Sequence, residues 1–210
     1  LAIRDVDLAI AIMKSTVTGV SLPKFMAMKA TASEFVVAGG EGIFELSGND
    51  IAVNVNWATQ WAGAPAKRAA VDFVQSFGTD GLLVNTGATG IALDFSEAFI
   101  EASVSHALLA ISEFVHISGD FGFRRGVDTN VSVKNLALGT TSTGVRARAI
   151  DIGANNVHAF VGVNGPTEDT NNDGRIDTLD LGDDAIGLAI TDFDFGLTVM
   201  ATEFSASAPL

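Results

Sequence analysis

The residues best suited to chemistry lie in one acidic segment, 169–180. Counted from Asp169, oxygen-bearing side chains stand at positions one, three, five, nine and twelve, and a glycine stands at position six. A calcium ion needs about 6–8 oxygen ligands, which alternate residues of a tightly turning loop can supply together. The spacing therefore predicts a calcium loop in which the backbone carbonyl of Arg175 fills position seven. The predicted side-chain ligands are Asp169, Asn171, Asp173, Asp177 and Asp180.

These twelve residues resemble the calcium loops of EF-hand proteins, and more closely those of dockerin modules, which favour aspartate as this segment does. The flanking residues differ from an EF-hand, because Val161–Pro166 has the pattern of a strand end and a turn. Without a pair of helices, the opening motion of a calcium sensor is not expected. An acidic solvated loop is the alternative interpretation, since Asp, Asn and Gly are ordinary turn residues.

The overall charge is strongly negative and excludes several classes of partner. The chain has 210 residues with 25 acidic and 12 basic side chains, and seven of the acids fall between Glu168 and Asp184. No basic stripe is present to neutralise phosphates, which argues against nucleic acid. No apolar stretch reaches the roughly 18 residues of a membrane span, so membrane insertion is not expected. The absence of cysteine excludes disulfides and thiolate metal sites.

The dominant pattern is an alternation of apolar and polar residues with a period of two, which predicts β-strands. In several strands the apolar phase changes partway along, as it does at Thr191–Asp192. Similar changes occur within 31–33, 47–50 and 153–156. A β-bulge at such a point returns the following apolar side chains to the same face of the sheet. We therefore expect long strands, each bent near its middle.

Short connections favour an antiparallel arrangement of these strands. Gly39–Gly42 is predicted to join a hairpin, and the segments 124–129 and 140–144 are predicted to do the same. The expected fold is all-β, an elongated two-layer stack of long bent antiparallel strands, with a parallel β-solenoid as the alternative. Two segments are less regular. Trp57–Phe77 is expected to be a loop with one helical turn near Lys67–Val71. Glu97–Phe114 is expected to be a strand, with a helix as the alternative because it lacks Gly and Pro.

An internal repeat links the two ends of the chain. Leu1–Met13 and Leu188–Met200 align without gaps at an offset of 187 residues, with Leu, Ala, Ile, Asp, Asp and Met in common. Tandem repeats stack end to end and grow in one dimension. We therefore expect residues 1–187 to form one full structural repeat and residues 188–210 to begin the next.

Other residues with chemical potential have a simpler structural interpretation. His106 and His116 alternate with apolar residues in strand-like runs, so hydrogen-bonded or surface histidines explain them better than catalysis. The pairs Asp5/Asp7 and Asp192/Asp194 are interpreted as a polar corner of each strand, with a second cation site as the alternative. Trp57 and Trp61 suggest packing more than sugar stacking. No HExxH, GxSxG or phosphate-binding loop is present, so no catalytic residue is assigned and the chain is not expected to be an enzyme.

The chain as a whole resembles the repeat units of very long bacterial secreted or surface proteins of the adhesin or matrix kind. The features that carry this resemblance are Leu-Ala-Ile-x-Asp-x-Asp at both ends, the run Ile117–Phe123 and the loop 169–180. It implies a Ca²⁺-stabilised structural repeat outside the cell, which builds a rod or filament from neighbouring repeats or identical subunits. The alternatives are an adhesive module that binds a glycan or a cell surface through Trp57–Lys67, and an extracellular hydrolase domain.

Overall fold

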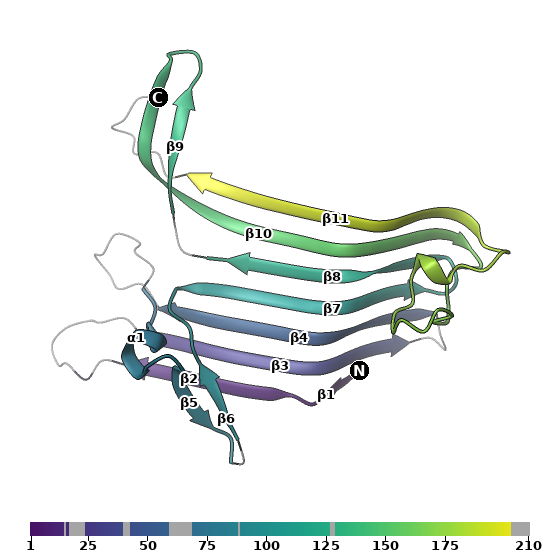
Figure 1. Ribbon diagram of the computed structural model, residues 1–210, viewed down its shortest axis with the longest axis horizontal. Coiled ribbons are helices and arrows are strands. Elements are labelled where there is room, and N and C mark those ends of the chain that lie inside the picture. The colour runs from purple at the N-terminus through teal and green to yellow at the C-terminus, as the bar shows by residue number, and fades with distance from the viewer. Residues whose placement is uncertain are drawn as a thin grey trace.

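The computed structural model describes residues 1–14, 16, 24–39, 43–58, 69–87, 89–126 and 129–202, and consists almost entirely of β-strands (Figure 1). Nine strands form one open sheet in the order β1-β3-β4-β7-β8-β10-β11, with β2 beside β3 and β9 beside β10. Every pairing between these strands is antiparallel. The strands are β1 (Ala2–Arg4), β2 (Asp7–Lys14), β3 (Lys24–Gly39), β4 (Phe44–Ala58), β7 (Phe99–Ile111), β8 (Val115–Arg125), β9 (Thr129–Asn135), β10 (Thr140–Val163) and β11 (Ile186–Thr202).

The predicted fold class is confirmed. The chain is all-β, its long strands bend near their middles, and strands that follow one another along most of the chain pair antiparallel (Figure 1). The alternative of a parallel solenoid is excluded for the described strands by their antiparallel pairing. The predicted strand within Glu97–Phe114 is confirmed as β7, and the hairpin on either side of residues 40–42 is confirmed by the pairing of β3 with β4.

The bends arise where a strand contains an extra residue in the left-handed region. Asp50, His106, Asn156 and Asp192 have φ values of 47°, 48°, 51° and 54°. The pairing register shifts near the bends in β4, β7 and β10. An inserted residue reverses the alternation of side chains, so the apolar residues after the bend return to the same face. Three of these positions fall in phase changes predicted from the sequence, whereas the bulge at His106 was not predicted.

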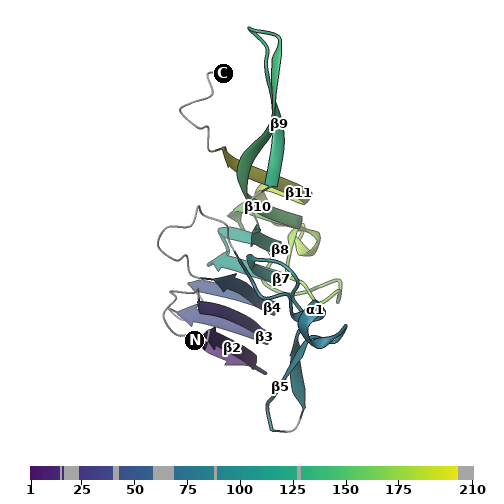
Figure 2. The same ribbon diagram turned by 90° about the vertical axis from the view of Figure 1, so that its left-hand side faces the viewer.

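One face of the sheet is partly covered, and we call it the covered face. The hairpin of β5 (Leu82–Asn85) and β6 (Gly90–Leu93) lies over β2 and β3 together with the short helix α1 (Phe73–Phe77), as Figure 2 shows. Their apolar side chains form the core cluster Ala9, Ala27, Phe73, Leu93, Phe95 and Phe99. Residues 164–185 also lie against this face, at the other end of the strands (Figure 1). Among the described residues, the second layer consists of these segments: β5, β6, α1 and residues 164–185.

The opposite face is apolar and carries no described element; we call it the open face. Directly opposed residues lie on the same side of an antiparallel sheet, so a row of side chains can be followed from strand to strand. One such row crosses the whole sheet and ends at Leu8, 49% exposed, and Leu197, 43% exposed. The row consists of Leu8, Ala30, Val53, Ala102, Phe123, Ile152 and Leu197.

Three local predictions were wrong. The segment 124–129 was predicted to join a hairpin, but the described strands on either side of residues 127–128, β8 and β9, do not pair with each other; both pair with β10, along different parts of its length. The turn between β9 and β10 lies at residues 136–139, and the segment 140–144 already belongs to β10. The helical turn lies after Val71, since Asp72 caps α1 by accepting a hydrogen bond from the Gln75 amide and Phe73 is fully buried. Residues 67–68 of the predicted turn lie outside the described residues.

Candidate metal site

The predicted calcium segment lies within the connection between β10 and β11. We call residues 164–185 the acidic loop. Where the loop leaves and rejoins the sheet, the Asn164 side-chain amide donates a hydrogen bond to the Asp184 carbonyl at 3.0 Å. Gly174, at position six of the predicted segment, has a φ of +87°. This left-handed conformation explains a glycine at the sharp turn, because other residues adopt it at a cost.

The first three predicted ligands lie in residues 169–174, which we call the exposed arm of the acidic loop although Asp169 itself is half-buried, and they accept hydrogen bonds from its backbone. Asp169 accepts from the amides of Asp173, at 3.2 Å, and Gly174, at 2.9 Å. Asn171 accepts from the Asp173 amide at 2.8 Å, and Asp173 accepts from the Arg175 amide at 2.9 Å. These bonds turn the backbone tightly and hold the three side chains within one short segment.

The last two predicted ligands, Asp177 and Asp180, are buried at the base of the loop, with 3% and 5% of their surface exposed. Asp177 caps and Asp180 ends a short 3-10 helix, η1 (Thr178–Asp180), and the two form a reciprocal capping box. Asp177 accepts from the Leu179 amide at 2.7 Å, and Asp180 accepts from the Asp177 amide at 3.0 Å. The sequence pattern placed these carboxylates in the loop but did not predict that they would be its buried part.

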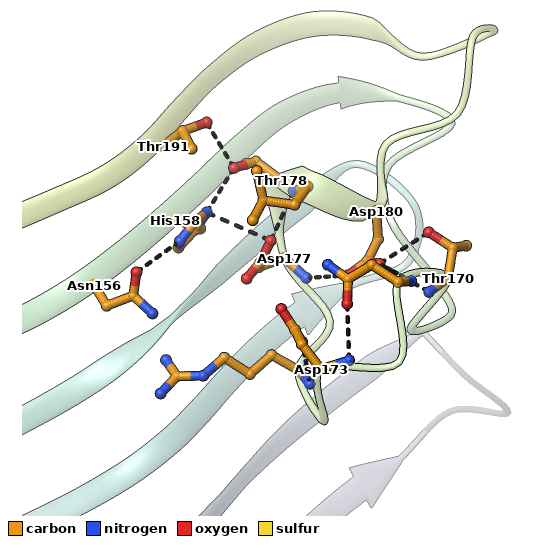
Figure 3. A network of polar contacts seen from close by, with 11 residues as sticks. Asn156, His158, Thr170, Asp173, Asp177, Thr178, Asp180 and Thr191 are labelled. Carbon is orange, nitrogen blue, oxygen red and sulfur yellow. Dashed lines mark hydrogen bonds and ion pairs between the residues drawn. The ribbon is translucent and has the colours of Figure 1, made fainter.

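Asp180 also joins the end of the acidic segment to its beginning. Its carboxylate accepts hydrogen bonds from the Thr170 amide at 2.8 Å, the Thr170 hydroxyl at 2.9 Å and the Asn171 amide at 3.2 Å (Figure 3). Burial alone raises the pKa of the Asp180 carboxyl, but these donors and the Asp177 amide outweigh burial and leave the pKa lowered. Asp180 is therefore held as a carboxylate, the form that a metal ion requires.

A buried histidine connects the acidic loop to the sheet. His158, in β10, is 3% exposed, and its Nδ1 lies 2.7 Å from the Thr178 hydroxyl and 3.5 Å from the Asp177 carboxylate. Its Nε2 lies 3.0 Å from the side-chain oxygen of Asn156, at the bulge of β10. The Thr178 hydroxyl also lies 2.7 Å from the Thr191 hydroxyl of β11 (Figure 3). Sequence reasoning missed this network, whose one local signal was Asn156 two residues before His158.

The Arg175 side chain points away from the predicted ligands. Its guanidinium lies 3.4 Å from the carboxylate of Asp120 in β8, and that carboxylate also accepts from the His106 amide at 2.8 Å. Burial opposes the lowering of the Asp120 pKa, and the His106 amide and Arg175 outweigh it. In the predicted calcium site only the backbone carbonyl of Arg175 would serve as a ligand, so this side-chain contact does not bear on that role.

The donor set is composed of carboxylate, amide and carbonyl oxygens, which suits a hard divalent cation such as Ca²⁺. Within the described part of the chain, no group of three or more His, Cys, Asp or Glu side chains is gathered closely enough to hold a metal ion. The structure thus brings the predicted ligands into one loop but separates their side chains into two groups. Asp169, Asn171 and Asp173 lie in the exposed arm, and Asp177 and Asp180 are buried. The chemistry of the donors fits calcium, and Asp180 is the residue that links the two groups.

The other residues that the sequence analysis considered for chemistry are the aspartates at the strand bends, His116 and the two tryptophans. Asp5 and Asp192 occupy the bends of the two edge strands, as the polar-corner interpretation predicted, with φ values of 47° and 54°. His116 is 5% exposed, and burial lowers its pKa against opposing contributions from the Ser112 backbone and Glu45. The Arg125 guanidinium lies 5.6 Å from the centre of the Trp57 ring. Trp61 and residues 59–68, which include most of the predicted adhesive segment, lie outside the described residues.

Comparison with known proteins does not place the chain in a family. Among the described residues, no helix combines the length and the apolar character needed to cross a membrane. No family of proteins, no curated protein and no solved structure matches this chain.

Proposed function

We propose that this chain is a calcium-stabilised structural repeat of a large secreted or cell-surface protein, and that such units join into a rod or filament. In this proposal the acidic loop holds Ca²⁺ and stabilises the connection between β10 and β11. The chain's partners are neighbouring repeats or identical subunits. No catalytic role is assigned to any of its residues.

The observation that carries the proposal is the open face of the sheet. An apolar row runs across seven strands from Leu8 to Leu197, and many large apolar side chains around it are exposed, among them Ile10, Phe195 and Val199. Monomeric soluble proteins rarely expose contiguous apolar patches larger than a few hundred Å², and larger ones mark contact surfaces. Both edges of the sheet also offer backbone groups that can pair with a further strand. A unit with these surfaces is suited to assembly.

The acidic loop supports the calcium part of the proposal. Seven acidic residues between Glu168 and Asp184 are accompanied by one basic residue, Arg175, so a divalent cation would reduce their mutual repulsion. Such a site does not exist in the unfolded chain, so the free energy of binding adds to the free energy of folding. A weak site, with a Kd of roughly 10⁻⁴–10⁻³ M, would be filled at extracellular calcium concentrations.

Hydrogen bonds connect the acidic loop to strands β10 and β11. Asp180 fixes Thr170 and Asn171 to the buried base of the loop. His158 and Thr191 connect that base to β10 and β11 through the Thr178 hydroxyl. Order imposed on the acidic loop would therefore stabilise the pair of strands at one edge of the sheet. This is the edge at which a structural repeat would meet its neighbour.

Calorimetry with calcium and then with excess chelator tests the proposal. We expect Tm to rise with calcium and to return with chelator, and we expect magnesium at equal concentration to raise it less, because Mg²⁺ demands a smaller and stricter geometry. Electron microscopy of the same samples should show elongated assemblies. An unchanged Tm would contradict the role of calcium, and dispersed monomeric particles at high protein concentration would contradict the structural role.

A further inference from the structure

The two edges of the nine-stranded sheet are formed by strands with matching sequences. β1 and β2 lie along one edge and β11 lies along the other, and no described strand pairs with the outer side of either edge. The matching residues are the repeated segments Leu1–Met13 and Leu188–Met200. The sheet therefore ends on both sides in the same kind of strand.

The two edge strands also share an uncommon backbone conformation. Asp5 and Asp192 are separated by the repeat offset of 187 residues, and both have positive φ, at 47° and 54°. Positive φ is uncommon for a residue other than glycine. The correspondence thus extends from the sequence to the position and geometry of the bend.

The edge strands run in the same direction. Six successive antiparallel pairings lead from β2 through β3, β4, β7, β8 and β10 to β11. Each pairing reverses the direction of the chain, so six reversals return it to the original one. Figure 1 shows β2 and β11 running in the same sense at opposite edges.

The edge strands also present equivalent side chains to the same face. The row that begins at Leu8 ends at Leu197, which corresponds in the repeat to Ile10. The stagger across one unit is therefore two residues, and an even stagger keeps every side chain on its original face. Six strand spacings of about 4.8 Å give a translation of roughly 29 Å from one edge to the other. This displacement, combined with the two-residue stagger and the twist of the sheet, relates β1 and β2 to β11.

The outer edge of β11 lacks most of the features that usually prevent pairing, and its one bulge, at Asp192, corresponds to the bend at Asp5 beside β3. Exposed edge strands are commonly short or interrupted by lysine or proline. β11 spans 17 residues, Ile186–Thr202, and contains no lysine, arginine or proline. Among the described strands, none pairs with the outer backbone groups of β11.

We propose that the outer edge of β11 pairs with β3 of a second copy of this unit, in the register that β3 uses with β1 and β2. In a tandem array β11 is itself the β1 and β2 of the second copy, so no strand has to leave β3, and the antiparallel sheet continues from one unit into the next. Ala189 lies opposite Val36 of the second copy and Phe195 lies opposite Ala30, as Ala2 and Leu8 do within one unit. This inference rests on the structural role proposed above and specifies how the units join.

A tandem chain tests the register directly. Residues 1–187 are followed without a linker by a second copy of residues 1–210, so that Leu1–Met13 of the second copy stands where Leu188–Met200 stood. The chain contains no cysteine, so introduced cysteines form no other disulfide. Ala154→Cys in the first copy is combined with Leu8→Cys in the second, because Ala154 lies opposite Phe195, the equivalent of Leu8.

The single chain with Ala154→Cys and Phe195→Cys provides the matched positive control. Opposed Cβ atoms in antiparallel sheets lie about 4.5–5.5 Å apart. We expect the tandem pair to form an intramolecular disulfide in a yield close to that of this control, because the same two positions are opposed in both chains. Ala154→Cys combined with Ile12→Cys in the second copy is the off-register control, and it should form little intramolecular disulfide. X-ray scattering should show a tandem particle longer by roughly 29 Å, the translation derived from the strand spacing.

A disulfide in the single-chain control without one in the folded tandem chain would overturn the inference. Should circular dichroism show that the tandem chain does not fold, the same cysteine pair is placed in a single chain whose residues 188–200 carry the sequence of residues 1–13. Failure to cross-link there equally overturns the equivalence of the edges. Loss of the cross-link with an intact calcium response rejects the edge pairing alone, whereas a normal cross-link without a calcium response rejects the role of calcium alone.

Discussion

Two segments cover opposite ends of the same face of the sheet, and they are held there by different forces. The hairpin of β5 and β6 and the helix α1 are attached by apolar contacts around Phe73 and Leu93, both fully buried. The acidic loop is held by polar contacts instead: Asp177 and Asp180, almost as deeply buried, accept hydrogen bonds from backbone amides of the loop, and the Thr178 hydroxyl joins it to the sheet. Burial of apolar surface depends little on protons or ions, whereas buried carboxylates respond to both.

This difference separates a permanent attachment from one that depends on the solution. The apolar cluster stabilises one end of the strands whenever the chain is folded. The acidic loop stabilises the other end only while its carboxylates are charged, and in our proposal it does so most strongly with calcium bound. Substitutions in the two segments should therefore differ in magnitude and in their dependence on calcium and pH.

The largest expected effect is that of Phe73→Ala in the apolar cluster. Removing a fully buried phenylalanine side chain costs about 3–5 kcal/mol, from lost burial and the cavity left behind. Urea unfolding followed by circular dichroism measures this loss. Phe77→Ala, one helical turn further on at a residue 51% exposed, is the matched control and should cost much less. Equal losses for the two variants would show that the cluster does not hold α1 to the sheet.

The next effect is that of Asp180→Asn in the acidic loop. The substitution removes a buried charge that accepts four hydrogen bonds, and we expect a loss of about 1.5–3 kcal/mol, the range for one hydrogen bond to a charged group. The increase in Tm caused by calcium should disappear in the same variant, while Phe73→Ala should retain it. Asp183→Asn, at an exposed acid of the same loop, is the control of equal charge. A full calcium response in Asp180→Asn would contradict the proposed site.

A smaller effect is expected for Gly174→Ala. Alanine in the left-handed conformation costs about 1–2 kcal/mol, although the new methyl group would meet no atom within 4 Å. Unfolding in urea with and without calcium should show this loss, together with weaker calcium binding. Gly122→Ala, in β8, also has open space around the new methyl group and no positive φ, so it should not destabilise the chain. A neutral Gly174→Ala would show that the sharp turn is not required.

The smallest expected effect is the loss of stability at low pH that Asp180 causes. The lowered pKa of Asp180 means that its contribution to stability is present above the ordinary carboxyl pKa of about 3.9 and is lost as the pH falls through the folded value. Asp180→Asn should therefore lose less stability than the unsubstituted chain when the pH is lowered below about 4. Phe73→Ala should follow the unsubstituted chain. Parallel curves for all three proteins would contradict the lowered pKa.

Much of the fold could be predicted from local sequence patterns. The alternation of apolar residues predicted the long strands, and the phase changes at 47–50, 153–156 and 191–192 predicted bends that the structure places at Asp50, Asn156 and Asp192. The sharp turn at Gly174 was likewise predicted by its place in the acidic segment. Each of these features is fixed by residues that are close in the sequence, because strand alternation and backbone conformation are local properties.

Pairing partners and buried polar contacts required the tertiary structure. β10 extends over 24 residues, so β9 pairs with its first part and β8 with its later part, an arrangement that no turn signal encodes. His158 meets Thr178, and Thr178 meets Thr191, across separations of 20 and 13 residues. The sequence by itself determined the strands, the bends at Asp50, Asn156 and Asp192, and the oxygen donors of the acidic loop. Only the folded sheet decided which edges remain open and which carboxylates are buried, because both depend on contacts between segments that are distant in the chain.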